Sequence, residues 1–82
     1  MESATAEVTV RFWAGAQRAA GHGEETALAA TVGDLRALLA RRPELRTVCA
    51  VATFLVDGQQ AGDATVLGDG AIVDVLPPFA GG

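Results

Sequence analysis

Few side chains in this sequence of 82 residues could take part in catalysis. His22 is the single histidine, and its glycine-rich surroundings predict an exposed loop position. Cys49 is the single cysteine, and its apolar neighbours favour a buried structural thiol over a nucleophile. No nucleophile has a base beside it in the sequence, and the aspartates lack the spacing of a calcium loop. We therefore predict no catalytic site and no metal site inside the domain.

The remaining candidate for chemistry is the carboxylate at the end of the segment LPPFAGG. Gly81 and Gly82 have no Cβ, so they could enter a channel too narrow for side chains. Pro77 and Pro78 lack a backbone donor and have a fixed φ, so they would end sheet pairing and stiffen the exit of the chain. From Pro77 onward the chain extends at most about 20 Å. We expect the carboxylate of Gly82 to be inserted into the active site of another protein.

Composition limits the other functions that the chain could have. The net charge is −4 and all six basic residues are arginine, so a P-loop lysine and a Schiff-base lysine are both excluded. An acidic chain without a basic stripe argues against binding nucleic acid. No stretch approaches the roughly 20 apolar residues of a membrane span. A lone cysteine excludes a disulfide within the chain and favours a cytoplasmic setting.

The secondary-structure elements that must position the Gly82 carboxylate are predicted to begin with two strands. Residues 1–6 have no apolar run and are expected to be a disordered start. Residues 7–13 (EVTVRFW) alternate between apolar and polar side chains, which predicts a strand with one buried face. Residues 14–23 predict a loop, with room for one helical turn at residues 17–20. Residues 24–30 predict a weaker strand that pairs with the first.

A helix is predicted next, in the segment TVGDLRALLARRP. Thr31 is suited to the N-cap, and Asp34 three residues later favours the positive end of a helix. Pro43 is expected to close this helix, although the segment that it begins could add another helical turn. The apolar run VATFLVDG then predicts a strand ending in a turn at Asp57 and Gly58. A short strand follows at best, and AIVDVL predicts a last, central strand.

This order of elements predicts an α+β fold of the β-grasp, ubiquitin-like type. We expect a mixed sheet of four to five strands packed on one main helix, with the first and last strands side by side. The domain would span residues 7–76, and residues 77–82, which we call the tail, would project from the centre of the sheet.

Four segments resemble the small, sulfur-carrying subunit of molybdopterin synthase, a member of the ubiquitin-like sulfur-carrier family. They are VTVRFWAGAQRAAG, TVGDLRALLARRP, VLGDGAIVDVLPP and PPFAGG. The likeness covers residues 7–82, and its most specific part is a strand followed by Pro-Pro, two further residues and Gly-Gly. Two departures are that only Arg18 remains of a charged segment common in the family, and that Gln59 and Gln60 are polar where an apolar docking residue is frequent.

The resemblance implies a mechanism in which a ubiquitin-activating-type enzyme adenylates the terminal carboxylate with ATP. A sulfur donor then displaces AMP, and the thiocarboxylate delivers sulfur to a large synthase subunit for molybdenum cofactor synthesis. The chain itself would bind no cofactor. By position, the resemblance implies a reacting carboxylate on Gly82, a channel segment of Gly81, Ala80 and Phe79, and a docking base of Leu76, Pro77 and Pro78.

Three alternatives stay open at the level of the sequence. The chain could carry sulfur for another pathway, such as thiamin, cysteine or a specialised metabolite. It could be a ubiquitin-like modifier that joins Gly82 to lysines of other proteins, although without lysine it could not build side-chain-linked chains of itself. It could also be an interaction module with an inert tail.

Overall fold

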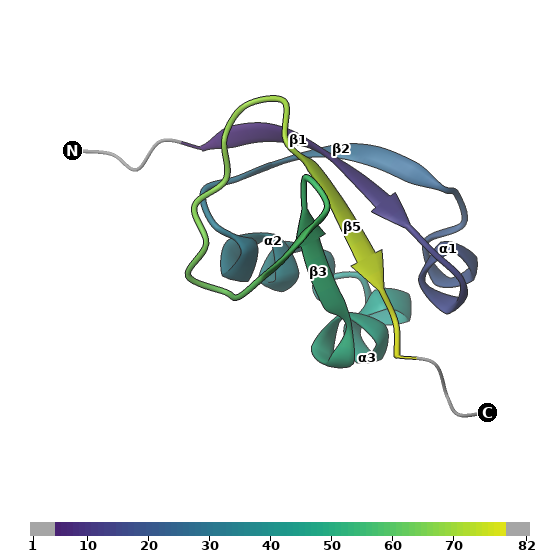
Figure 1. Cartoon of the computed structure of the whole chain (residues 1–82). Helices are drawn as coiled ribbons and strands as arrows, with labels where there is room; N and C mark the ends of the chain where they lie inside the picture. The colour runs from purple at the N-terminus through teal and green to yellow at the C-terminus, as the bar shows by residue number, and fades with distance from the viewer. Residues whose placement is uncertain (1–4, 79–82) are drawn as a thin grey trace.

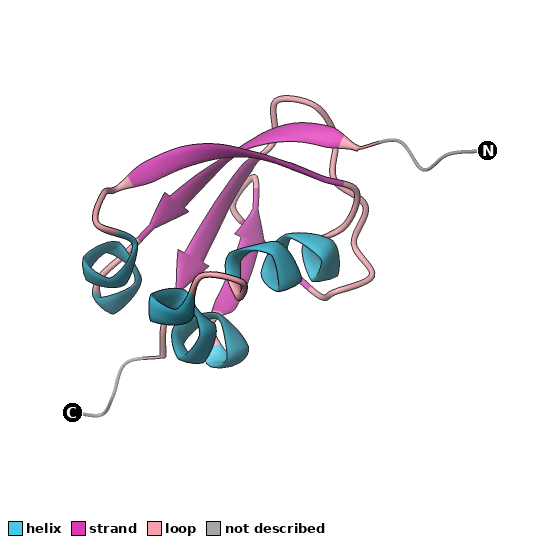
Figure 2. Cartoon of the chain, turned by 180° about the vertical axis from the view of Figure 1, so that it is seen from behind, coloured by secondary structure: helices cyan, strands magenta, loops and turns pink. Residues whose placement is uncertain are grey.

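A five-stranded mixed sheet with three helices on one of its faces forms the domain (Figures 1 and 2). The computed structural model describes residues 5–78, and residues 1–4 and 79–82 lie outside this description. Along the chain the elements are β1 (Ala6–Phe12), α1 (Gly15–Ala20), β2 (Glu24–Ala29), α2 (Val32–Leu39), α3 (Pro43–Val51), β3 (Thr53–Val56), β4 (Gln59–Ala61) and β5 (Ile72–Leu76).

The order of the strands in the sheet is β2-β1-β5-β3-β4. The central pair, β1 and β5, is parallel, and the other pairs are antiparallel. The first and last strands are therefore neighbours, and the chain between them crosses over through the helices (Figure 1). The predicted β-grasp fold is confirmed.

The hydrophobic core lies between the sheet and the helices. Alternate residues of the central strands face the helices because successive side chains of a strand point to opposite faces. The core side chains that are almost completely buried are Val8, Val10 and Phe12 of β1, Ala16 of α1, Val32, Leu35 and Leu39 of α2, Leu45 and Cys49 of α3, Phe54 of β3, and Val73 and Val75 of β5. Within residues 5–78, no helix covers the other face of the sheet (Figure 2), and we call it the open face.

The helical layer differs from the prediction of one main helix. Thr31 caps α2 as expected, because its Oγ1 accepts a hydrogen bond of 3.1 Å from the backbone N–H of Asp34. Pro43 separates α2 from α3: Arg42 before it is extended (φ −84°, ψ 118°), and Pro43 itself occupies the first turn of α3. The possible extra turn is thus a separate helix of nine residues, and α1 has six residues where a single turn was predicted.

The first strand begins at Ala6, one residue earlier than predicted, because this side chain is buried opposite Ala29 of β2. It ends at Phe12, so Trp13 lies just beyond it. Of the start that was predicted to be disordered, residues 1–4 lie outside the described residues. No helix within residues 5–78 is both long and apolar enough to cross a membrane.

Candidate functional site

The tail leaves from β5, the strand in the middle of the sheet. Leu76, the last residue of β5, pairs with Thr53 of β3 and is half-buried. Pro77 is also half-buried and Pro78 is exposed, so the chain becomes more exposed to solvent as it leaves β5. The end of β5 lies at the same end of the molecule as α1 and α3 (Figure 1). The predicted docking base is therefore at the surface, whereas the predicted channel segment and reacting group, residues 79–82, lie outside the described residues.

One row of side chains crosses the open face from edge to edge. In the strand register, Arg11 of β1 is opposite Glu24 of β2 and Asp74 of β5. Asp74 is in turn opposite Leu55 of β3, which is opposite Gln60 of β4. Asp74 is thus a carboxylate in the middle strand, at the centre of the sheet and away from the helical core.

Asp74 is nearly buried because two side chains cover it, those of Arg11 in β1 and of Trp13 just after β1. Its side chain is 8% exposed. Arg11 binds it through both carboxylate oxygens, with 2.7 Å from Nε to Oδ1 and 3.2 Å from Nη2 to Oδ2. The indole Nε1 of Trp13 donates a third hydrogen bond to Oδ1, at 2.8 Å. The hydrogen bond from Arg11 lowers the pKa of Asp74 most, burial opposes this, and the bond from Trp13 lowers it further.

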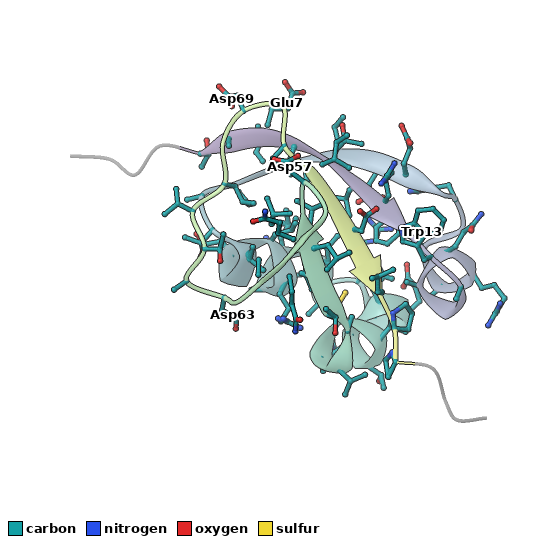
Figure 3. The ribbon with its side chains drawn as sticks, in the orientation of Figure 1. Glu7, Trp13, Asp57, Asp63 and Asp69 are labelled. Atoms are coloured by element: carbon teal, nitrogen blue, oxygen red, sulfur yellow. The ribbon has the colours of Figure 1, made fainter. Side chains whose placement is uncertain are left out.

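Four apolar side chains surround this carboxylate, and we call them the open-face patch: Trp13, Leu55, Ile72 and Leu76. Ile72 and Leu76 are the second neighbours of Asp74 along β5, on the same face of the strand. Trp13 is 46% exposed and Ile72 is 38% exposed, although both are large apolar residues. Figure 3 shows Trp13 at the end of β1 near α1. The patch therefore continues directly into the base of the tail.

Sequence reasoning did not single out Asp74, Arg11 or Trp13. A signal was nevertheless present, since AIVDVL places one acidic residue in an otherwise apolar strand that was predicted to be central. The predicted first strand places Arg11 and Trp13 on its polar side. With β1 and β5 adjacent, an arginine and an aspartate on matching faces of neighbouring strands are the expected partners for a buried carboxylate.

His22 lies in the loop between α1 and β2 and is exposed, as predicted. Its Nε2 lies 2.6 Å from Oε1 of Glu25, and Nη1 of Arg42 lies 2.7 Å from Oε2 of the same carboxylate. Burial alone would raise the pKa of Glu25, but the hydrogen bonds from Arg42 and His22 hold it below its usual value. This cluster joins the start of β2 to the link between α2 and α3, which is a structural role.

Cys49 is completely buried in α3, and burial raises the pKa of its thiol. The predicted structural thiol is therefore confirmed. Within residues 5–78, no group of three or more His, Cys, Asp or Glu side chains could hold a metal ion. Arg18 on α1 and Gln59 and Gln60 on the edge strand β4 are all exposed.

Comparison with known proteins gives a consistent result. A model of the ThiS family matches residues 10–82. The solution structure of the small archaeal modifier protein 1 (SAMP1) from Methanosarcina acetivorans is similar, with a TM-score of 0.82 and 29% identity over 95% of this chain and 98% of that one.

Two further solved structures are similar to this chain. One is a putative molybdopterin converting factor, subunit 1, from Pyrococcus furiosus, with a TM-score of 0.78 and 25% identity over 90% of this chain and 99% of that one. The other is a chain in the complex of subunits 1 and 2 of the molybdopterin-converting factor from Helicobacter pylori, with a TM-score of 0.74 and 26% identity over 93% and 99%. A comparison with curated proteins found no match.

Proposed function

The chain belongs to the ThiS family of ubiquitin-like sulfur carriers, and on that premise we propose that Gly82 carries sulfur as a C-terminal thiocarboxylate. The observation that supports this most is the path of the chain. The central strand β5 leads through Pro77 and Pro78 directly into the tail, and the family match continues to Gly82. A tail that starts from the middle of a sheet has a rigid base, so a partner that grips the domain also fixes the start of the tail.

A carboxylate is a poor electrophile, so it must first be activated. A ubiquitin-activating-type partner would use ATP: the Gly82 carboxylate attacks the α-phosphorus, pyrophosphate leaves, and an acyl-adenylate forms. A hydrosulfide-level sulfur donor then attacks the acyl carbon, the bond from carbon to the AMP oxygen breaks, and a thiocarboxylate remains. In this proposal ATP belongs to the partner, and the chain supplies only the carboxyl group and the docking surface.

The acceptor that we propose is a large synthase subunit that makes molybdopterin. Support comes from the similarity to the putative molybdopterin converting factor subunit 1 and to a chain of the complex of subunits 1 and 2. Leu76, Pro77 and Pro78 would form the docking base, and Phe79, Ala80 and Gly81 would enter the partner's channel.

A second candidate function is the modification of proteins through Gly82. The similarity to the small archaeal modifier protein 1 supports it, with 29% identity over 95% of the chain. Both functions begin with the same activated carboxylate and differ in the nucleophile that receives it, either a sulfur donor or an amine of a target protein.

The test is an intact-mass measurement of the full chain after incubation with a cognate adenylating enzyme, ATP and a sulfur source. We expect a mass gain equal to the exchange of one oxygen for sulfur, absent when Gly82 is deleted and retained in the surface control Glu7→Gln. If no adenylating enzyme from the source organism produces this gain, the carrier role is contradicted. Heavier conjugates in cells that require Gly82 would favour the modifier, and co-purification with a large synthase subunit would favour molybdopterin synthesis.

A further inference from the structure

The burial of Asp74 on the open face is the starting observation. A carboxylate removed from water is costly unless it is paired and hydrogen-bonded. Its two oxygens receive three donors, two from the guanidinium of Arg11 and one from the indole of Trp13. The ion pair with Arg11 would by itself balance the charge. The hydrogen bond from Trp13 is therefore not needed to balance the charge, and its effect is to fix the orientation of the indole.

Trp13 is attached to β5 at two points. Its backbone N–H donates to the carbonyl oxygen of Val75 at 3.3 Å, and its indole N–H donates to Asp74 at 2.8 Å. The indole has one donor and no acceptor, so its polar group is fully used inside the molecule. What remains exposed is an apolar ring in a fixed orientation. Large rigid rings of this kind lose little conformational entropy on binding, which is why they act as anchors in interfaces.

The length of the tail places this anchor next to any enzyme that reacts at Gly82. Pro78 is the last described residue, and the four residues that follow it span at most about 14 Å. An active site that holds the Gly82 carboxylate must therefore cover the surface around Leu76 and Pro78. Trp13 belongs to the same surface, since its backbone is bonded to β5 one residue before Leu76.

We infer that Asp74 is a positioning residue that holds the Trp13 indole on the open face as a preformed anchor for the adenylating enzyme. This inference rests on the proposed function. The adenylating enzyme is the occupant because every version of that function requires it, whichever pathway later receives the sulfur. Its surface should offer an apolar pocket to the ring, without an acceptor for the indole N–H, since that group is already bonded to Asp74.

The experiment measures ATP–pyrophosphate exchange by the adenylating enzyme as a function of the concentration of the carrier. Asp74→Ala and Trp13→Ala should each raise the KM for the carrier about tenfold, the effect of losing one good interface anchor, with kcat changed less than about twofold. The double variant Arg11→Leu/Asp74→Leu replaces the ion pair by an apolar pair and frees the indole N–H. This double variant should raise the KM for the carrier as much as Asp74→Ala does. It replaces Asp74→Ala in the experiment if that variant does not fold.

A spectroscopic readout separates positioning from a general loss of structure. Trp13 is the single tryptophan, so its fluorescence reports on this indole alone. In the Asp74 variants, acrylamide should quench it more strongly than in the wild type while the thermal unfolding transition remains cooperative. The control is Glu7→Gln, which removes a negative charge from the same face of β1 at the opposite end from Trp13 (Figure 3) and should change neither KM nor quenching.

A folded Asp74 variant whose indole is quenched more strongly than in the wild type, but whose KM for the carrier is unchanged, would overturn the inference while leaving the proposed function intact. So would variants that weaken only a later acceptor enzyme, or only association between copies of the chain, because the anchor is assigned to the adenylating enzyme. A wild-type chain that no adenylating enzyme activates would instead overturn the proposed function, and the assigned partner with it.

Discussion

The guanidinium of Arg36 lies over the ring of Phe54, with 4.5 Å between its Cζ atom and the ring centroid. Its Nη1 also donates hydrogen bonds to the backbone carbonyl oxygens of Cys49 and Ala52. The last carbonyls of a helix have no partner within it, so one side chain of α2 both satisfies the end of α3 and covers an aromatic residue of the core. The break that Pro43 makes between α2 and α3 is therefore bridged by Arg36.

Replacing Arg36 should destabilise the domain. Arg36→Ala leaves carbonyl oxygens at the end of α3 without a donor and uncovers Phe54, so we expect the free energy of unfolding to fall by about 2 kcal/mol. Urea unfolding followed by circular dichroism measures it. The control Arg41→Ala changes an exposed arginine just beyond α2 and should stay within about 0.5 kcal/mol. Equal effects of the two variants would contradict the role given to Arg36.

Ala14 offers a site for stabilisation. It has φ 51° and ψ −126°, in the region that favours glycine, within a turn where the N–H of Ala16 donates to the carbonyl of Trp13 at 3.0 Å. Ala14→Gly relieves this strain and should raise the free energy of unfolding by about 1 kcal/mol, net of the greater freedom of glycine in the unfolded chain.

The matched control for this variant is Ala16→Gly, two residues later in α1. Ala16 is buried and its φ is not positive, so glycine there should lower stability by about 1 kcal/mol. Thermal unfolding of both variants provides the measurement. If Ala14→Gly lowered the midpoint as Ala16→Gly does, the strain assigned to Ala14 would be absent.

Stability should depend on pH through Asp74. Its pKa is lowered in the folded state, chiefly by the hydrogen bond from Arg11, so between the folded and unfolded pKa values the unfolded chain binds more protons. The contribution is therefore fully present above the usual aspartate value of about 4 and is lost as the pH falls through the lower folded value. Asp74→Asn keeps the shape of the side chain without the charge. The stability difference between the wild type and Asp74→Asn should shrink as the solution is acidified.

Urea unfolding at a series of pH values between about 2 and about 7 covers this range. Glu7→Gln, which changes an exposed carboxylate on the same face of β1, is the control for the loss of one negative charge. An Asp74→Asn profile that runs parallel to that of the wild type down to the lowest pH would show that the Asp74 carboxylate does not contribute as described.

Cys49 should be unreactive while the protein is folded. Its side chain is completely buried and burial raises the pKa of its thiol, so both access and the thiolate fraction are low. We expect a disulfide reagent such as dithionitrobenzoate to modify it at least about 100-fold more slowly in buffer than in urea. In the variant Cys49→Ala/Val51→Cys, the thiol occupies a position that is 61% exposed on the same helix and should react at once. Fast reaction of native Cys49 would mean that α3 opens readily.

Local patterns predicted the strands and the start of the main helix because their signals lie within short segments. Alternation marked β1, the pair Thr31 and Asp34 marked the start of α2, and an apolar run marked β5. The helix α1 was underestimated because AGAQRAA consists mostly of small residues without an amphipathic period. The length of α3 depends on burial of Leu45 and Cys49 against other elements, which local signals do not contain.

The candidate site was predicted only in part for a similar reason. The Pro-Pro and Gly-Gly segments are local features, and they led to the sulfur-carrier family, which is confirmed. The roles given to residues 79–82 concern residues that the structure does not describe, so they stay predictions. The cluster of Arg11, Trp13 and Asp74 requires the register between the first and last strands, and that register becomes visible only once the strands are placed side by side.

The pairing of β1 with β5 also governs when the protein can fold during its synthesis. The ion pair between Arg11 and Asp74 joins residues 63 positions apart, and β5 is the middle strand of the sheet. A nascent chain that has not yet released β5 from the ribosome has neither the central strand pair nor the open face. The chain must lose the entropy of closing this long loop before the contacts between β1 and β5 can stabilise the fold. The proposed docking surface and the segment that leads to Gly82 thus form at the same stage of synthesis, so the adenylating enzyme that we propose as a partner would not meet one without the other.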